Sequence, residues 1–389
     1  MRVVTPHSVD DVKDALADAI RAGVRLEIRG GGSKIDFGAP REATILDMRG
    51  FSRVIDYDPA ELVLTVGAGV PLSQVRALLR SEDQMLAFDP WDQGLLYGRP
   101  GLTTIGGVVM AGVAGPARVT TGGARDHLLG FTAVSGRGEA FVGGAKVVKN
   151  VTGYDLPKLM AGSWGRLSAL TQLTLRVLPR PRTITTLAAD DLSPRQAHAI
   201  MTRALGSNAN VSAAAYIPAM LRDGRSLTIL AVAGFEPSVM ARCASLSALF
   251  AADHPLRPLE QEEAASAWDG VRHARPLTGD ILWRVHVRPS SVCDLITLLE
   301  PYGVRWLMDW GGGLLWVESD AQDCMVRSIA SATGGQATLV RARPEIRTHV
   351  PTLHPGTPTV VALEARVRAA FDPRGVWETG RFLKDAYAD

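Results

Sequence analysis

The sequence of 389 residues has few cysteines and no long apolar run. Its three cysteines, Cys243, Cys293 and Cys324, are far apart and show no CxxC spacing, which excludes a complete cysteine ligand set for an iron–sulfur cluster or a structural zinc site. No apolar stretch approaches the roughly 18 residues that span a bilayer. The N-terminus lacks the charged and apolar regions of a secretory signal. These absences predict a cytoplasmic protein in a reducing compartment.

An excess of charge of one sign is also missing. The 42 basic and 40 acidic residues leave a formal net charge of +2, which provides no basic field for nucleic acid and no acidic tail. The chain is 46% hydrophobic, as soluble globular proteins are, and it is too long for one ordinary core. Two or three domains are therefore expected. Glycine is abundant, with 39 residues, which favours turns and close backbone approaches.

A glycine triplet, Gly30–Gly32, follows a segment that alternates apolar and polar residues, Val24–Ile28. The alternation is typical of a half-buried strand. Consecutive glycines permit positive φ and place no side chain in the way of a ligand. Their N–H groups can converge on an anion such as phosphate, although a flexible hairpin turn is the alternative interpretation.

The order of elements around the triplet excludes two common nucleotide folds. A helix over residues 8–23 precedes the strand, and Ser8 with Asp11 forms a capping-box pattern at its start. In a Rossmann unit the glycine loop would open a helix after the strand. No Gly-Lys-[Ser/Thr] sequence occurs, so a P-loop is also excluded.

The remaining pattern predicts short strands in the first half and mixed elements in the second. Residues 87–130 are dense in glycine and contain no long helix, which is typical of a functional loop region. A Pro-Arg repeat at 179–182 marks a boundary. Before it, strands are expected at 43–47, 53–57, 61–66, 131–135, 140–142 and 169–178, and a helix after Pro71. Beyond it, helices at 193–205, 236–250, 292–299 and 320–332 alternate with strands at 227–233, 281–287 and 313–318, followed by a connector at 349–359 and a helix at 359–371. This order predicts an α+β domain with an antiparallel sheet.

Six motifs occur in one order along the chain. They are Arg29-Gly30-Gly31-Gly32-Ser33, Thr104-Ile105-Gly106-Gly107, Gly123-Ala124-Arg125-Asp126, Gly153-Tyr154-Asp155-Leu156, Gly162-Ser163-Trp164-Gly165 and Phe371-Asp372-Pro373-Arg374-Gly375. With them the chain resembles flavoproteins of the vanillyl-alcohol oxidase type, which have a PCMH-type FAD-binding domain. Its whole length is similar to the FAD-binding E subunits of bacterial glycolate oxidase (glycolate dehydrogenase). The segments 149–156 and Asp309-Trp310-Gly311-Gly312-Gly313 carry this narrower resemblance.

The resemblance implies an α+β fold in three parts. Residues 1–180 would form a PCMH-type FAD-binding domain of two α+β halves, residues 181–358 an α+β cap or substrate-like domain, and residues 359–389 a segment that returns to the FAD domain. The glycine loop would hold the FAD pyrophosphate, with the Ser33 hydroxyl as an added donor. The implied cofactor-binding residues are Gly30, Gly31, Gly32, Ser33, Lys34, Thr104, Ile105, Gly106, Gly107, Gly123, Asp126, Tyr154, Gly162, Ser163 and Gly165.

The departures from the family pattern restrict the chemistry. Ser33-Lys34 stands where some relatives have a histidine that bonds to the flavin, which implies non-covalent FAD. Glu378-Thr379-Gly380 stands where catalytic relatives have Asn-Pro-Gly. The His-Gly-His and Gly-Asp-Gly-Asn-Leu-His elements of related 2-hydroxy-acid dehydrogenases are missing, so no metal site and no catalytic residue is assigned. A metal held by His349 and His354 is the alternative, which their Pro/Gly-rich surroundings disfavour.

The resemblance implies an FAD-dependent oxidoreductase that acts on CH–OH donors. The chain would serve a complex that oxidises glycolate, a small 2-hydroxy acid, to glyoxylate. It would transfer electrons or assist assembly beside a catalytic FAD subunit and an iron–sulfur subunit, and the complex would lie in the cytoplasm or peripherally at the inner face of the cell membrane. Two alternatives remain: a stand-alone FAD-dependent oxidase or dehydrogenase of another alcohol or 2-hydroxy acid, and an assembly subunit with a decayed flavin site.

Several of the motif residues have a second, structural interpretation. Asp155 is either a base or a turn residue that bonds its own backbone. Tyr154 either stacks on a flavin ring or packs beneath a loop. Arg125 and Asp126 could form an ion pair that only fixes a loop, and Lys34 could be solvated. For Trp306, Trp310 and Trp316, core packing or a subunit contact competes with lining a substrate cavity.

Overall fold

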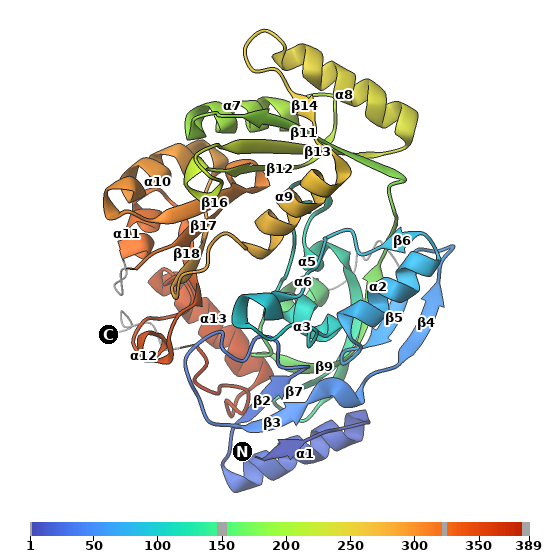
Figure 1. Cartoon of the computed structure of the whole chain (residues 1–389). Coiled ribbons are helices and arrows are strands. Elements are labelled where there is room, and N and C mark those ends of the chain that lie inside the picture. The colour runs from blue at the N-terminus through green and yellow to red at the C-terminus, as the bar shows by residue number, and fades with distance from the viewer. Residues whose placement is uncertain (1, 146–153, 321–324, 383–389) are drawn as a thin grey trace. The chain divides into compact units, whose positions relative to one another are not determined.

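The computed structural model describes residues 2–145, 154–320 and 325–382 (Figure 1). Residues 149–153 of the motif segment 149–156, residues 321–324 of the helix expected at 320–332, and Cys324 lie outside the described residues. The chain forms two compact units. Unit 1 comprises Met1–Ala114, Gly122–Arg180 and Pro355–Asp389, and unit 2 comprises Gly115–Thr121 and Pro181–His354. Helices and antiparallel strands occur in both, which confirms the predicted α+β class.

Helix α1 (Val9–Ala22) begins and ends as its sequence predicts. The Asp11 amide donates to Ser8 Oγ at 3.1 Å, and the Ser8 amide donates to the Asp11 carboxylate at 3.0 Å, which completes the capping box. Gly23 ends the helix with φ at 66°, a left-handed conformation that glycine adopts without strain. The buried side chains Val12, Leu16 and Ala19 place the apolar face of the helix in the core.

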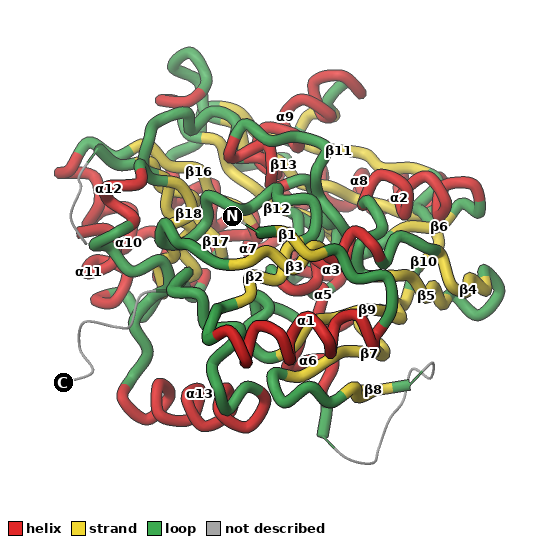
Figure 2. The backbone as a smooth tube through the Cα atoms, turned by 90° about the horizontal axis from the view of Figure 1, so that it is seen from below, coloured by secondary structure: helices red, strands yellow, loops and turns green. Residues whose placement is uncertain are grey.

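A small parallel sheet follows α1 and positions the glycine triplet. Strand β2 (Leu26–Arg29) and strand β1 (Val3–Val4) both pair with β3 (Thr44–Asp47). Figure 2 shows α1 beside this sheet, and Leu16 of the helix shares a core cluster with Leu26 and Leu46. The chain therefore leaves a buried strand at Arg29 and enters the triplet directly.

Unit 1 also contains a five-stranded antiparallel sheet in the order β4-β5-β9-β7-β8. The predicted strands and the helix after Pro71 are confirmed with shifts of one to three residues at their ends, and the helices in the glycine-rich region are all short. The further elements of this unit are β4 (Val54–Asp58), β5 (Val63–Gly67), α2 (Leu72–Ser81), β6 (Gln84–Met85), α3 (Ile105–Met110), α5 (Ala124–His127), β7 (Leu128–Ser135), β8 (Ala140–Gly144), α6 (Leu156–Met160), β9 (Ser168–Arg176), β10 (Leu178–Pro179) and α13 (Pro358–Phe371).

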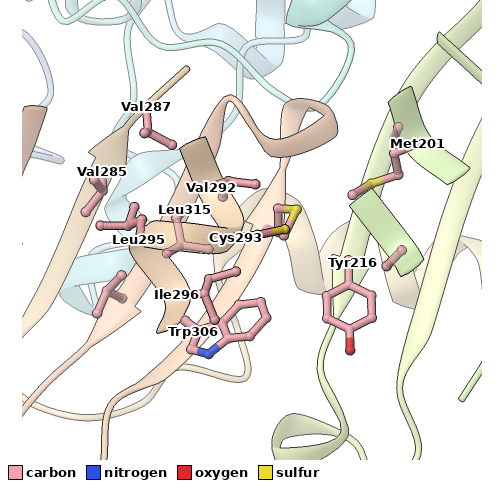
Figure 3. Packing of buried hydrophobic residues seen from close by; sticks show 14 of the residues in the cluster. Met201, Tyr216, Val285, Val287, Val292, Cys293, Leu295, Ile296, Trp306 and Leu315 are labelled. Atoms are coloured by element: carbon pink, nitrogen blue, oxygen red, sulfur yellow. The ribbon is translucent and has the colours of Figure 1, made fainter. Parts of the chain in front are cut away.

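Unit 2 is built on an eight-stranded antiparallel sheet in the order β14-β11-β13-β12-β16-β17-β15-β18. Helices α7, α8, α10 and α11 contribute to a core cluster on one face of this sheet (Figure 3). The elements are α4 (Arg118–Thr121), β11 (Thr183–Asp190), α7 (Pro194–Leu205), β12 (Val211–Ile217), β13 (Leu227–Gly234), α8 (Glu236–Phe250), β14 (Arg257–Pro258), α9 (Gln261–His273), β15 (Leu282–His286), α10 (Val292–Leu299), β16 (Arg305–Asp309), β17 (Leu314–Glu318), α11 (Met325–Ala332), β18 (Gln336–Arg341) and α12 (Pro344–Arg347).

Sequence pattern failed to predict several elements of unit 2, among them α9, β11, β12, β16 and β18. Strand β12 reads Val-Ser-Ala-Ala-Ala-Tyr-Ile, and alanine has low strand propensity, so pairing with β13 over nearly its whole length decides its conformation. Helix α9 carries only three buried residues and a run of acidic and small residues at its start, which leaves a weak helical period.

Candidate functional site

The glycine triplet lies in the wall of a recess in unit 1 that encloses about 690 Å³ of atom-free space, part of it open to solvent. The recess is lined by the segment Glu27–Ile35, by the start of α3, by Trp164 and Gly165, and by Arg381. Nine residues predicted to bind a cofactor lie together here: Gly30, Gly31, Gly32, Ser33, Lys34, Thr104, Gly106, Gly107 and Gly165.

Close backbone packing explains why the loop consists of glycines. A Cβ atom on Gly31 would lie 1.8 Å from the carbonyl oxygen of Leu102, and one on Gly30 would lie 2.2 Å from Thr104 Oγ1. Thr104 in turn caps α3, because its Oγ1 accepts from the Gly107 amide at 3.3 Å. Gly32 has φ at +83°, which a larger residue rarely adopts. The triplet is therefore a fixed part of the recess wall.

One buried carboxylate organises the arginines beside the loop. Glu27 accepts from Arg41 Nε at 2.7 Å and pairs with Arg29 at 3.0 Å and with Arg381 at 3.7 Å. Burial alone would raise the pKa of Glu27, but the neighbouring charges of Arg381 and Arg41 hold that pKa below its usual value. Glu27 is thus ionised. Its one negative charge holds three arginines in place, so a net positive charge remains beside the loop.

Lys34 brings a buried ammonium group to the same wall. The residue is 8% exposed, and its Nζ donates to Ser33 Oγ at 3.2 Å. Burial lowers its pKa to about 8, the carboxylate of Asp92 acts in the opposite direction, and Arg381 lowers the pKa further. The described residues offer Lys34 no ion pair, so the ammonium group has unmet capacity to bind an anion.

Arg381 reaches the recess from the C-terminal segment. Its Nη2 donates to the Lys34 carbonyl at 3.1 Å, and its Nε is buried without a hydrogen-bond partner among the described residues. Burial lowers the pKa of Arg381 to about 9, Arg41 lowers it further, and Glu27 opposes the shift. The guanidinium lies 5.5 Å from the ring of Trp164, which stacks on Phe37 with ring centroids 4.2 Å apart.

Six predicted cofactor residues do not line this recess. Ile105 is fully buried inside α3, Asp126 caps Gly123 with a hydrogen bond of 2.8 Å, and Gly162 and Ser163 bond to Val109 and Met110 of α3. Tyr154 is 91% exposed, so the expectation of a tyrosine packed beneath a loop is wrong. Asp155 caps α6 by accepting from the Lys158 amide at 3.2 Å, as a turn aspartate does. A cofactor role for these six residues stays a prediction.

Sequence reasoning did not single out four residues of the recess wall. Glu27 and Arg29 adjoin the triplet, but the alternation along β2 assigns Glu27 to the solvent face, so it gave no sign that Glu27 is buried. Trp164 lies inside a motif that was recognised only by its small residues. Arg381 is 347 positions from the Lys34 carbonyl that it binds, and no local pattern connects the two.

The alternative metal site has no support among the described residues. His354 Nδ1 accepts from the Ala337 amide at 3.2 Å, and His354 Nε2 lies 3.4 Å from the Ser331 hydroxyl. Within residues 2–145, 154–320 and 325–382, no three histidine, cysteine, aspartate or glutamate side chains gather as metal ligands would. In the same ranges no helix is long and apolar enough to cross a membrane.

Known proteins share this fold or part of this sequence. Residues 1–144 match the family described as FAD binding domain. The glycolate oxidase subunit GlcE of Escherichia coli (strain K12) is 31% identical over 96% of this chain and 98% of its own length. The glycolate oxidase subunit GlcD of Bacillus subtilis (strain 168) is 26% identical over 67% of this chain and 53% of its own length. A structure of p-cresol methylhydroxylase has a TM-score of 0.68 at 15% identity, over 97% of this chain and 88% of its own.

The fold, the recess and these matches define an FAD-dependent oxidoreductase with a PCMH-type FAD-binding domain. The chain belongs to the family of the glycolate oxidase subunit GlcE. Both statements confirm the resemblance that the six motifs carried, and they confirm FAD as the cofactor.

The residues of the recess fit the pyrophosphate of FAD. Three cations (Arg29, Lys34 and Arg381) and one carboxylate (Glu27) line it, an excess of two positive charges that an anion of opposite charge would balance. The unpartnered Nε of Arg381 and the unpaired ammonium of Lys34 are donors for phosphate oxygens. The side-chain-free wall of Gly30–Gly32 permits close approach of the ligand.

Proposed function

We propose that this chain is the FAD-binding subunit of a glycolate dehydrogenase (oxidase) complex that oxidises glycolate to glyoxylate. The similarity to GlcE along nearly the full length of both chains carries the proposal, and the cationic, glycine-lined recess supports it. Its implied partners are a catalytic FAD subunit and an iron–sulfur subunit, and the predicted location, in the cytoplasm or at the inner face of the membrane, belongs to the same proposal.

The residues of the recess would hold the cofactor without a covalent bond. The peptide groups of Gly30–Gly32 and the Ser33 hydroxyl would bind the pyrophosphate, and the charges of Lys34 and Arg381 would neutralise it. Bound FAD supplies an acceptor for a hydride and passes the electrons on. The aromatic pair of Phe37 and Trp164 offers a flat apolar surface beside the phosphate subsite.

The absence of certain motifs from the sequence supports an electron-transfer or accessory role. The motifs that supply metal and substrate ligands in related 2-hydroxy-acid dehydrogenases are missing from it, and no residue beside the recess is assigned as a base. In this proposal the partner flavoprotein carries out the oxidation, and this chain holds a second flavin.

The visible spectrum of the chain purified alone, followed by dye reduction with glycolate, tests the proposal. The expected result is a yellow protein that turns over glycolate only when its partners are added. Turnover by the chain alone would instead support the stand-alone dehydrogenase. A colourless protein that cannot be reconstituted with FAD would leave only the alternative of an assembly subunit with a decayed flavin site. A Lys34→Met variant serves as the control for flavin bound in the recess, and it should lose most of the colour.

A further inference from the structure

A second, smaller recess adjoins the FAD recess in unit 1. It encloses about 280 Å³ of atom-free space, part of it open to solvent. Five residues line both recesses: Glu27, Ile28, Trp164, Gly165 and Arg381. The other lining residues are Arg166 and four residues of the C-terminal segment, Trp377, Glu378, Thr379 and Phe382. The C-terminal segment therefore lies against residues that also form the wall of the FAD recess.

The wall residue Trp164 depends on this segment for its position. Trp164 has φ at 56°, which is rare for a bulky residue and persists only where the surrounding contacts hold it. The buried ring of Phe382 meets the Trp164 ring edge to face, with centroids 6.0 Å apart, and meets the Phe37 ring at 6.1 Å. A shift of residues 378–382 would therefore displace both Trp164 and Arg381 in the FAD recess.

An ion pair connects the segment to the residue that follows the Gly-Ser-Trp-Gly motif. Arg166 Nη2 donates to the Glu378 carboxylate at 2.9 Å, and the Arg166 Cζ lies 5.1 Å from the ring centroid of Phe382. The side chains of Arg166 and Glu378 are 19% and 39% exposed, so water screens this pair less than a fully exposed one. The Arg166 Nε is buried without a partner among the described residues, which leaves Glu378 as the carboxylate that balances its charge.

Core contacts hold the first part of the segment without the ion pair. Val376 and Trp377 belong to the core cluster of Leu26, whose amide donates to the Val376 carbonyl at 3.0 Å. Figure 1 shows the segment after α13, in red, beside β2. Past Trp377 the chain leaves this cluster, and Gly380 has φ at +79° with open space around it among the described residues. The ion pair thus acts on residues 378–382, beyond the part that the core fixes.

We propose that Arg166 and Glu378 are positioning residues whose ion pair holds residues 378–382 against the wall of the FAD recess and slows the release of FAD. The proposal rests on Arg381 as a ligand of the cofactor, as the proposed function has it. Arg381 must withdraw before the pyrophosphate can leave, and the ion pair makes that movement rarer. Its effect is therefore on the dissociation rate more than on the association rate.

The direction of one charge effect separates positioning from simple electrostatics. Neither Arg166 nor Glu378 lines the FAD recess itself. If Glu378 acted only through its charge, Glu378→Gln would make the surroundings of the recess more positive and would strengthen FAD binding. If Glu378 holds the segment in place, the same variant binds FAD more weakly despite the added positive charge.

The rate of FAD release from the full-length flavoprotein tests the proposal. FAD fluorescence after rapid dilution measures this rate, and titration of the flavin-free chain with FAD measures the affinity. Glu378→Gln and Arg166→Met should each release FAD about 5- to 30-fold faster, the range expected when one coupled contact is lost. The double variant should release FAD no faster than the faster single variant. Arg166→Glu combined with Glu378→Arg restores the pair in reverse and should recover part of the slow release.

Asp10→Asn is the matched control, because it removes one carboxylate from an ion pair of equal length in the same unit, that of Lys13 with Asp10 at 2.9 Å on α1. Its release rate should equal that of the wild type. Tighter FAD binding by Glu378→Gln, additive effects in the double variant, or a wild-type release rate in both single variants would overturn the proposal. If Arg166→Met fails to fold, as judged by circular dichroism, Glu378→Gln decides.

Turnover does not enter this measurement. A yellow chain whose variants release FAD at the wild-type rate would contradict the positioning role alone. A chain that meets every expectation for FAD release but never supports glycolate oxidation with its partners would contradict the proposed function alone.

Discussion

At the scale of single residues, the two units surround buried cations with different groups. In unit 1, Lys34 and Arg381 face a wall of glycines, where peptide groups can add donors for phosphate. In unit 2, the Arg284 guanidinium lies 5.1 Å from the ring of Trp310 and 5.7 Å from that of Trp316. The peptide groups in unit 1 favour a polyanion such as a pyrophosphate, and the described residues around Arg284 form no such wall of peptide groups.

Substitution of a loop glycine should destabilise the chain most where the new Cβ would lie too close to backbone atoms. Gly31→Ala would bring a Cβ to 1.8 Å from the Leu102 carbonyl, so the loop must move. We expect a loss of stability of about 1–3 kcal/mol, the usual cost of overpacking, and weaker FAD binding, measured by thermal melts and flavin titration. Gly270→Ala in α9 has open space around the new Cβ and should be neutral or stabilise by up to about 1 kcal/mol. Equal effects of both variants would contradict this explanation of the triplet.

Lys34 should make FAD affinity depend on pH in the alkaline range. The pKa of Lys34 is about 8 without an anion, and a bound pyrophosphate favours the charged form and raises that pKa. Binding is then linked to proton uptake, so affinity should be constant below about pH 8 and fall as the pH rises above it.

Fluorescence titration of FAD between pH 7 and 10 measures this dependence. Lys34→Met should bind FAD about 10- to 100-fold more weakly at pH 7, as expected for a lost charge-assisted contact, and its affinity should not fall near pH 8. Lys13→Met, at an exposed lysine of α1, should behave as the wild type. A fall of the same size in Lys34→Met would refute the assignment.

At the scale of elements, the segment 372–381 after α13 leads to the recess. Asp372 is buried and accepts from the Val376 amide at 2.9 Å and the Trp377 amide at 2.8 Å. Arg25 holds the same turn by donating to the carbonyls of Arg374 and Gly375. These contacts fix the path that brings Arg381 beside Lys34.

Asp372→Ala should therefore affect both stability and FAD binding. It leaves two buried amides without their acceptor, and we expect a loss of about 2–6 kcal/mol, since each unsatisfied group costs about 1–3 kcal/mol. FAD affinity should also fall, because Arg381 loses its fixed position. Urea unfolding and flavin titration measure the two effects. Asp280→Ala, at an exposed aspartate of unit 2, should change neither by more than about 0.5 kcal/mol. If Asp372→Ala were destabilised but bound FAD with full affinity, the segment would have no role in positioning Arg381 for FAD binding.

At the scale of the whole molecule, FAD should be released when the chain unfolds. Ser33 and Lys34 follow the triplet, at the place where some relatives have a histidine that bonds covalently to the flavin. Acid precipitation should leave the flavin in the supernatant, whereas colour retained in the pellet would contradict non-covalent binding. Because FAD binds the folded chain, saturation at 100 times the dissociation constant should stabilise it by about 2.7 kcal/mol, seen as a rise in melting temperature that Lys34→Met reduces.

Local sequence determined the elements with strong periodicity or distinct end signals. The capping box of α1, the alternation that leads into Gly30 and the proline-rich break near Pro181 all act over a few neighbouring residues, so they can be read without a structure. The ordered motifs also indicated the family and the cofactor, because a glycine needed for close backbone approach leaves a trace in the sequence itself.

The tertiary structure decided what no local pattern records. Strand β12 forms because its neighbours pair with it, despite its three alanines. Arg381 joins the wall of the recess from 347 residues away, and Arg284 meets Trp310 only because β15 and β16 lie on either side of β17. Charge and burial at these positions depend on long-range packing, and therefore the positive charge of the recess became visible only in the folded chain.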